Sequence, residues 1–154
     1  MSAYLDALRM LGRREYSASE IRSRLIDREH TPDETDAAVE RLLETRALDD
    51  RRVARAYART ASNVKGRGRL RVQRELQVMG IARDVATEAI AEVFGDLDER
   101  ALIAKAIRKK LHGGKQMVTL QERARVYQFL MRQGFTPGAI SAALRRAGGS
   151  TADE

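Results

Sequence analysis

The chain has 154 residues with 29 Lys or Arg and 22 Asp or Glu, which gives a formal net charge of +7. This length suits one compact domain or a short array of repeats. There is no cysteine, which excludes disulfides, thiolate zinc sites and a cysteine nucleophile. No apolar run approaches the roughly 18 residues of a membrane span, and the amino terminus lacks the pattern of a signal peptide. We therefore expect a cytoplasmic protein without membrane association.

Amphipathic spacing and helix caps predict three helices in the first third of the chain. The apolar face of the first helix follows the spacing i, i+3, i+4, i+7, as Tyr4, Ala7, Leu8 and Leu11. Ser17 and Glu20 form a capping box that opens a second helix. Thr31 and Glu34 form another box, with Pro32 at the first helical position of a third helix. The expected inner face of that helix is Thr35, Ala38, Val39 and Leu42.

The middle of the chain is strongly basic. Residues 51–74 hold nine Lys or Arg and no Asp or Glu, so the rest of the chain sums to about −2. The pattern predicts a helix capped by Asp49 or Asp50, a basic turn at 65–69 and a second helix. The expected inner face of the first of these helices is Val53, Ala56, Tyr57 and Thr60. On the second, Val72, Leu76 and Met79 should face inward and Arg67, Arg71 and Arg74 outward.

Four further helices are predicted in the rest of the chain. Gly80 should end the fifth helix, and the sixth should bury Ala86, Ala89, Ile90 and Val93 before Gly95. A seventh should start at Asp96, bury Ile103, Ile107 and Leu111, and close at 112–114. A third capping box, Thr119 with Glu122, should open the eighth. The ninth should start at Pro137 and bury Ile140, Ala143, Leu144 and Ala147.

These nine helices indicate an internal repeat. Aligning Leu25, Leu76 and Leu130 superposes Pro32, Arg83 and Pro137, so the only two prolines share one repeat position. A period near 50 residues, with three helices per unit, predicts an all-α, elongated, slightly curved solenoid of three tandem three-helix repeats. The expected repeats are 1–49, 50–95 with the basic element, and 96–148, followed by a flexible tail at 149–154.

The basic element is interpreted as a contact for a polyanion. A solvated helix face would carry i,i+4 ion pairs, and this run has no anion to form them. Its only aromatic residue, Tyr57, is expected to face inward, so contacts should go to phosphates or an acidic protein surface. A second basic patch lies near the end of the seventh helix: Lys105, Arg108, Lys109, Lys110 and Lys115. Complementing the helix dipole is the alternative role for that patch. The candidate binding residues are Arg51, Arg52, Arg55, Arg59, Lys65, Arg67, Arg69, Arg71, Arg74, Lys105, Lys109 and Lys110.

Catalytic chemistry is not indicated. No nucleophile–base pair stands out, and helix capping accounts for Asp49 and Asp50. His30 and His112 are too few for a metal site. We expect no enzymatic activity, metal or cofactor.

Three stretches of the chain carry recognisable motifs: 7–17 (ALRMLGRREYS), 48–57 (LDDRRVARAY) and 65–76 followed by Gly80 and Ile81. In this order and spacing they resemble the RecX family of bacterial regulators of the RecA recombinase. The resemblance covers residues 3 to about 147. Two positions depart from the family pattern: Val53 stands where Phe is usual, and Met79 where Lys is usual.

The resemblance implies a protein that lodges in the deep groove of the RecA filament on single-stranded DNA. It would bridge neighbouring protomers and depress the ATPase, strand-exchange and co-protease activities of RecA. The expected partners are the RecA nucleoprotein filament and, through phosphate contacts, single-stranded DNA, with the protein acting as a monomer. The alternatives are a general DNA-binding architectural protein and a helical adaptor for an acidic protein partner.

Overall fold

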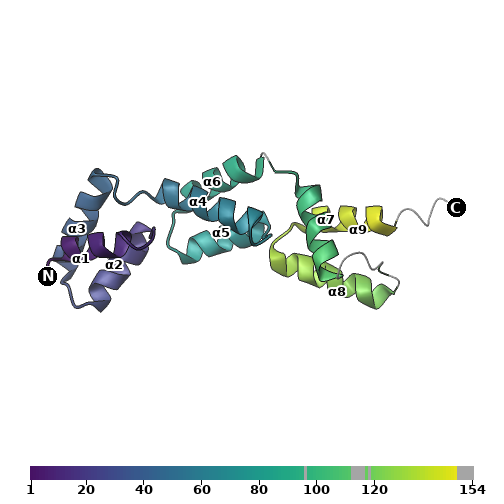
Figure 1. Cartoon of the computed structure of the whole chain (residues 1–154), viewed down its shortest axis with the longest axis horizontal. Helices are drawn as coiled ribbons and strands as arrows, with labels where there is room; N and C mark the ends of the chain where they lie inside the picture. The colour runs from purple at the N-terminus through teal and green to yellow at the C-terminus, as the bar shows by residue number, and fades with distance from the viewer. Residues whose placement is uncertain (96, 112–116, 118, 149–154) are drawn as a thin grey trace. The chain divides into compact units, whose positions relative to one another are not determined.

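The computed structural model describes residues 1–95, 97–111, 117 and 119–148. Over these residues the chain forms nine α-helices and no strand (Figure 1), which confirms the predicted all-α class. The helices are α1 (Ala3–Leu11), α2 (Ala18–Asp27), α3 (Pro32–Glu44), α4 (Asp50–Asn63), α5 (Arg69–Val78), α6 (Arg83–Gly95), α7 (Glu99–Lys110), α8 (Leu120–Gln133) and α9 (Pro137–Gly148). None of the helices described is long and apolar enough to cross a bilayer. The predicted helix start at Asp96, His112, Lys115 and the predicted tail at 149–154 lie outside the described residues.

The chain divides into two compact units. Unit 1 consists of Met1–Tyr57 with Glu75–Ala89, and unit 2 of Ala58–Arg74 with Ile90–Glu154. Helices α4, α5 and α6 therefore each contribute residues to both units. The predicted repeat boundaries, 1–49, 50–95 and 96–148, stay predictions.

The core of unit 1 lies where α1 and α2 pack against α3. The predicted inner face of α3, from Thr35 to Leu42, is buried as expected. For α1 the prediction of Leu8 is wrong, since that side chain is 36% exposed. The prediction of Ala7 is confirmed, and the other buried apolar residues of α1 are Ala3 and Met10.

The predicted caps form the expected hydrogen bonds at the starts of several helices. Both predicted boxes in unit 1 are complete, with Ser17 and Glu20 at α2 and Thr31 and Glu34 at α3. At α8, the Thr119 hydroxyl accepts from the Glu122 N–H at 3.1 Å.

The choice between the two aspartates at α4 is settled by their partners. The Asp49 carboxylate accepts from the N–H groups of Arg51 and Arg52, at 3.0 and 3.3 Å, so Asp49 is the N-cap. Asp50 accepts from the N–H of Ala18 at 2.9 Å. This pair of adjacent carboxylates therefore serves the starts of two helices, α4 and α2.

The predicted inner face of α4 is wrong at two positions. Ala56 and Thr60 are exposed, and Tyr57 is half-buried. The buried residues of α4 are Val53, Ala54, Ala58, Ala61 and Ser62. Alanines lie on both sides of this helix, so apolar spacing alone could not assign its inner face.

The same helix-ending turn occurs three times, at the positions that the repeat alignment superposes. In each case an N–H donates to a buried leucine carbonyl: His30 to Leu25 at 3.1 Å, Ile81 to Leu76 at 3.1 Å and Phe135 to Leu130 at 3.2 Å. The preceding residues have positive φ: Glu29 at 70°, Gly80 at 80° and Gly134 at 100°. Backbone of this kind is typical of a left-handed helix C-terminus. The alignment made from sequence therefore superposes equivalent structural positions.

A charge cluster around the buried Asp6 ties α1 to the first of these turns. The Asp6 carboxylate is buried, lies 3.0 Å from His30 Nε2 and forms an ion pair with Arg28. The hydrogen bond from His30 is the main reason that the pKa of Asp6 lies below its ordinary value, and Arg28 acts in the same direction. Burial of the carboxylate opposes both effects.

The lowered pKa of Asp6 predicts acid sensitivity of unit 1. Because the folded pKa is depressed, ionised Asp6 stabilises the protein above the unfolded pKa, and this stability is lost as pH falls through the folded value. Asp6→Asn should lower the thermal midpoint at neutral pH and reduce its dependence on pH below about 4. Circular dichroism melts at pH 3 to 7 would measure this. Parallel midpoint curves for variant and wild type would contradict it.

Candidate nucleic-acid interface

The position of Lys65 is set by the end of α4. The N–H of Arg67 donates to the Ala61 carbonyl at 2.9 Å, and that of Lys65 to the Thr60 carbonyl at 3.2 Å. Between them Gly66 has φ of 65°, a conformation that favours glycine. Helix α4 thus ends in a tight turn, with the Lys65 side chain exposed next to the last turn of the helix.

The lysines of α7 come from a helix anchored on α8 and α9. Asp98 is the N-cap of α7, and Ile103 and Ala106 are its buried residues. Lys105, Lys109 and Lys110 are exposed. Lys105 and Lys109 are four residues apart, so they lie on the same side of the helix.

These segments line one groove within unit 2, named here the lysine groove, with a volume of about 350 Å³. Its cations are Lys65, Lys105, Lys109 and Lys110. Its apolar and neutral polar lining is Ser62, Asn63, Val64, Gly66, Leu102, Ala106, Phe129 and Gln133. None of these described lining residues is acidic. The structure therefore brings together Lys65 from the first predicted basic segment and three lysines from the second.

The charges of the lysine groove are poorly explained by stability of the fold. Within the described part of the chain, none of the four lysines has an ion-pair partner. Like charges at i and i+4, as for Lys105 and Lys109, are destabilising by a few tenths of a kcal/mol. The dipole of α7 favours cations in its last turn, which includes Lys109 and Lys110 but neither Lys105 nor Lys65. The four side chains are exposed, so either solvent with counter-ions or an anionic ligand can compensate their charge.

Phe129 is the aromatic residue of this groove. It is half-buried, packed against the core of unit 2, and the Lys110 ammonium lies 5.1 Å from the centre of its ring. Phe129 was not among the binding residues predicted from the sequence. The repeat alignment could have indicated that Phe129 is partly exposed, because Arg24 and Glu75 occupy the equivalent positions in the other two repeats. Polar residues there indicate a position at the edge of the core, where an aromatic ring remains partly accessible.

The start of α5 is held by backbone contacts with the end of α8. The N–H of Gly68 donates to the Gln133 carbonyl at 2.7 Å, and that of Leu70 to the Gly134 carbonyl at 3.0 Å. A Cβ on Gly68 would lie 2.5 Å from the Gly134 carbonyl carbon, so the two backbones are in direct contact. Helix N-termini often bind phosphate, but at the start of α5 the N–H groups of Gly68 and Leu70 already donate to protein carbonyls.

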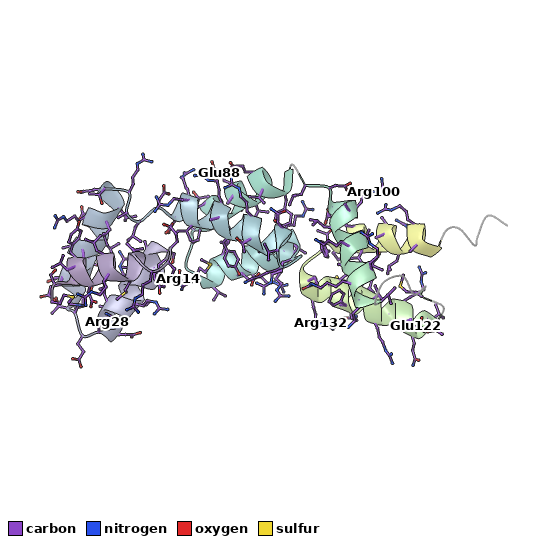
Figure 2. The ribbon with its side chains drawn as sticks, viewed as in Figure 1. Arg14, Arg28, Glu88, Arg100, Glu122 and Arg132 are labelled. Carbon is purple, nitrogen blue, oxygen red and sulfur yellow. The ribbon has the colours of Figure 1, made fainter. Side chains whose placement is uncertain are left out.

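Two of the predicted binding residues have ion-pair partners in unit 1. Arg51 Nη1 lies 2.6 Å from Glu88 Oε2, and Glu88 is seen on α6 in Figure 2. Arg52 donates to both carboxylate oxygens of Glu15, at 3.0 and 3.2 Å, and to the Arg46 and Ala47 carbonyls. The hydrogen bonds from Arg52 to Glu15 raise the pKa of the guanidinium. Arg52 therefore holds the α3–α4 connection.

The remaining predicted residues differ in their surroundings. Arg71 donates to Gln133 Oε1 at 2.9 Å, so it supports the contact between α5 and α8. Arg67 lies before α5, in the turn, so it is not on the outer helix face where it was expected. Arg59, Arg69 and Arg74 in unit 2 are exposed, and Arg55 in unit 1 is half-buried. Their contacts with a polyanion stay predictions, as do those of Arg51, Arg52, Arg67, Arg71 and the groove lysines.

Three family models match successive parts of the chain. They are described as the first, second and third three-helix domains of RecX, and they match residues 3–42, 49–90 and 98–144. The chain belongs to the RecX family. The matches also confirm that the nine described helices are organised as three tandem three-helix domains.

Curated relatives and solved structures agree with RecX membership. The chain is 33% identical to the "Regulatory protein RecX" of Halorhodospira halophila over 141 residues, which cover 92% of this chain and 85% of the relative. It is 34% identical to the "Regulatory protein RecX" of Chromohalobacter salexigens over 130 residues, covering 84% and 82%. The crystal structure of RecX from Lactobacillus salivarius has the same fold, with a TM-score of 0.77 and 19% identity over 95% of this chain and 94% of that one.

Proposed function

We propose that this protein suppresses the RecA recombinase by binding the RecA filament on single-stranded DNA. It depresses the ATPase, strand-exchange and co-protease activities of the filament, and it acts as a monomer in the cytoplasm without catalysing a reaction itself. Family membership supports the choice of RecA as partner. The observation that carries the contact with the DNA strand is the lysine groove, with four lysines and no acidic residue among its described lining.

The proposed mechanism is stabilisation of one filament arrangement. The lysine groove would hold the phosphates of the bound strand, while other surfaces of the protein would contact RecA. A ligand that binds one arrangement of the protomers better than the others shifts the population toward it. ATP turnover requires the protomers to rearrange, so the filament would hydrolyse ATP more slowly.

The proposal predicts that purified protein lowers ATP hydrolysis by filaments assembled beforehand. A coupled ATPase assay with DNA in excess excludes simple competition for DNA. Replacement of Lys65, Lys105 and Lys109 by Gln should weaken inhibition. The slope of the logarithm of the binding constant against the logarithm of the salt concentration should also become less steep, by about 0.7 for each phosphate that the variant no longer neutralises. Replacement of Arg108, Arg145 and Arg146 by Gln is the matched control, because these exposed arginines lie outside the groove and carry the same total charge.

Two outcomes of this assay would count against the proposal. Undiminished turnover at saturating protein, with binding to the filament measured in parallel, would leave the architectural DNA-binding alternative. If the lysine variant and the wild type inhibited equally and with equal salt dependence, the groove lysines would not contact DNA. They would then form an ordinary solvated surface.

A further inference from the structure

We propose that the lysine groove holds one unstacked base of single-stranded DNA against Phe129, with neighbouring phosphates bound by Lys105 and Lys109. The proposal rests on the proposed function in taking single-stranded DNA as the ligand. It goes further by assigning the groove a contact with a base. Phosphate contact alone was the expectation for this protein.

The lining of the groove supplies what a nucleotide requires. Leu102, Ala106 and Phe129 provide an apolar surface. The Asn63 amide can donate to or accept from a base edge, and the Gln133 amide can donate its N–H groups while its oxygen accepts from Arg71. The four lysines provide point charges for phosphates. Stacking on aromatic side chains combined with a basic groove is the general mode of binding single strands without sequence preference.

The position of the Phe129 ring is consistent with an incoming base. Lys110 is exposed, and its ammonium lies 5.1 Å from the ring centre. The ring is therefore faced on that side by an exposed, charged side chain. A cation–π contact at an exposed site is weak, so the lysine side chain can move from the ring to a phosphate, which would leave the ring surface to the base.

The shape and chemistry of the groove favour a nucleotide over a segment of an acidic protein. A groove of about 350 Å³ is compact, whereas an amphipathic helix needs an apolar surface that spans residues i to i+7. The lysines can bind either a phosphate or a carboxylate as point charges, but the Phe129 ring offers a stacking surface that suits a base and not a carboxylate. An acidic peptide is therefore the second choice, and the experiment below separates the two.

The test compares two labelled strands of the same length, about 12 nucleotides, without RecA. One is oligothymidylate, and the other has the same phosphates and sugars but abasic sites in place of the bases. In fluorescence anisotropy titrations the full chain should bind oligothymidylate about tenfold more tightly than the abasic strand. Phe129→Leu should bring this ratio close to one, while affinity for the abasic strand stays the same.

Further variants control for folding and for charge. Phe129→Tyr keeps the ring and should keep the preference for the strand with bases, and thermal melts of each variant would check the fold. Lys109→Gln should weaken binding of both strands, whereas Arg108→Gln, the adjacent exposed residue outside the groove, should weaken it less.

Each result has a defined meaning. Equal affinity of the wild type for both strands, or an unchanged ratio in Phe129→Leu, would overturn the base contact and leave a phosphate site. No binding of either strand, with an acidic peptide bound instead, would overturn it in favour of a protein ligand. Because the assay contains no RecA, a preference for bases would stand even if the ATPase assay failed, and the reverse also holds.

Discussion

Replacing Gly134 by alanine should lower the free energy of unfolding by roughly 2–5 kcal/mol, the sum expected for left-handed backbone and an overpacked contact. Gly134 has φ of 100°, and a Cβ there would lie 2.5 Å from the backbone nitrogen of Arg71. The obstacle is therefore backbone, which cannot move aside as the end of a flexible side chain can. Urea denaturation followed by circular dichroism would measure the loss.

The repeat provides a matched control for this substitution. Glu29 occupies the equivalent turn in unit 1 and adopts φ of 70° with a side chain in place. Glu29→Gly should change the free energy of unfolding by less than about 1 kcal/mol, because relief of left-handed strain is offset by greater freedom of the unfolded chain. Small effects at both positions would mean that the backbone of α5 and α8 is not in close contact.

The second large effect is expected at Leu76. This side chain is 0% exposed, and its truncation to alanine should cost about 2–5 kcal/mol. Val78 lies two residues further along α5 and is 89% exposed, so Val78→Ala is the control and should change stability by less than about 0.5 kcal/mol. If the two variants had the same denaturation midpoint, the assigned inner face of α5 would be wrong.

Local signals in the sequence predicted most of the fold because they depend on residues close together in the chain. Ser17 and Glu20 satisfy each other's backbone donors within one turn, so the capping box can be read without the tertiary structure. The inner face of α3 was also predictable from nearby residues, because Val39 and Leu42 are large apolar side chains at helical spacing. On α4 the size of the side chain does not distinguish the two faces, because Ala54 is buried and Ala56 is exposed.

Partners distant in sequence limited what could be predicted about the site. The basic run has no acidic residue of its own, yet Arg52 pairs with Glu15, 37 residues away. The lysine groove depends on tertiary packing in the same way, because Lys65 and Lys105 belong to segments that the sequence analysis treated as separate patches. The charge runs therefore led to the prediction of a polyanion as ligand, which stays a prediction, and they could not tell arginines with ion-pair partners from lysines without one.

The contact between α5 and α8 has a consequence for how the protein is completed on the ribosome. Arg71 and Gln133 are bonded across 62 residues of chain, and unit 2 is built from two separate segments, Ala58–Arg74 and Ile90–Glu154. At a translation rate of about 5–20 residues per second, roughly 3–12 s pass between the synthesis of Arg71 and that of Gln133. During that interval the first amides of α5 lack their carbonyl acceptors and the basic segment is without its partner. We therefore expect the basic segment to lack its α8 contacts until α8 has been made, and to be open to polyanions such as ribosomal RNA during that time.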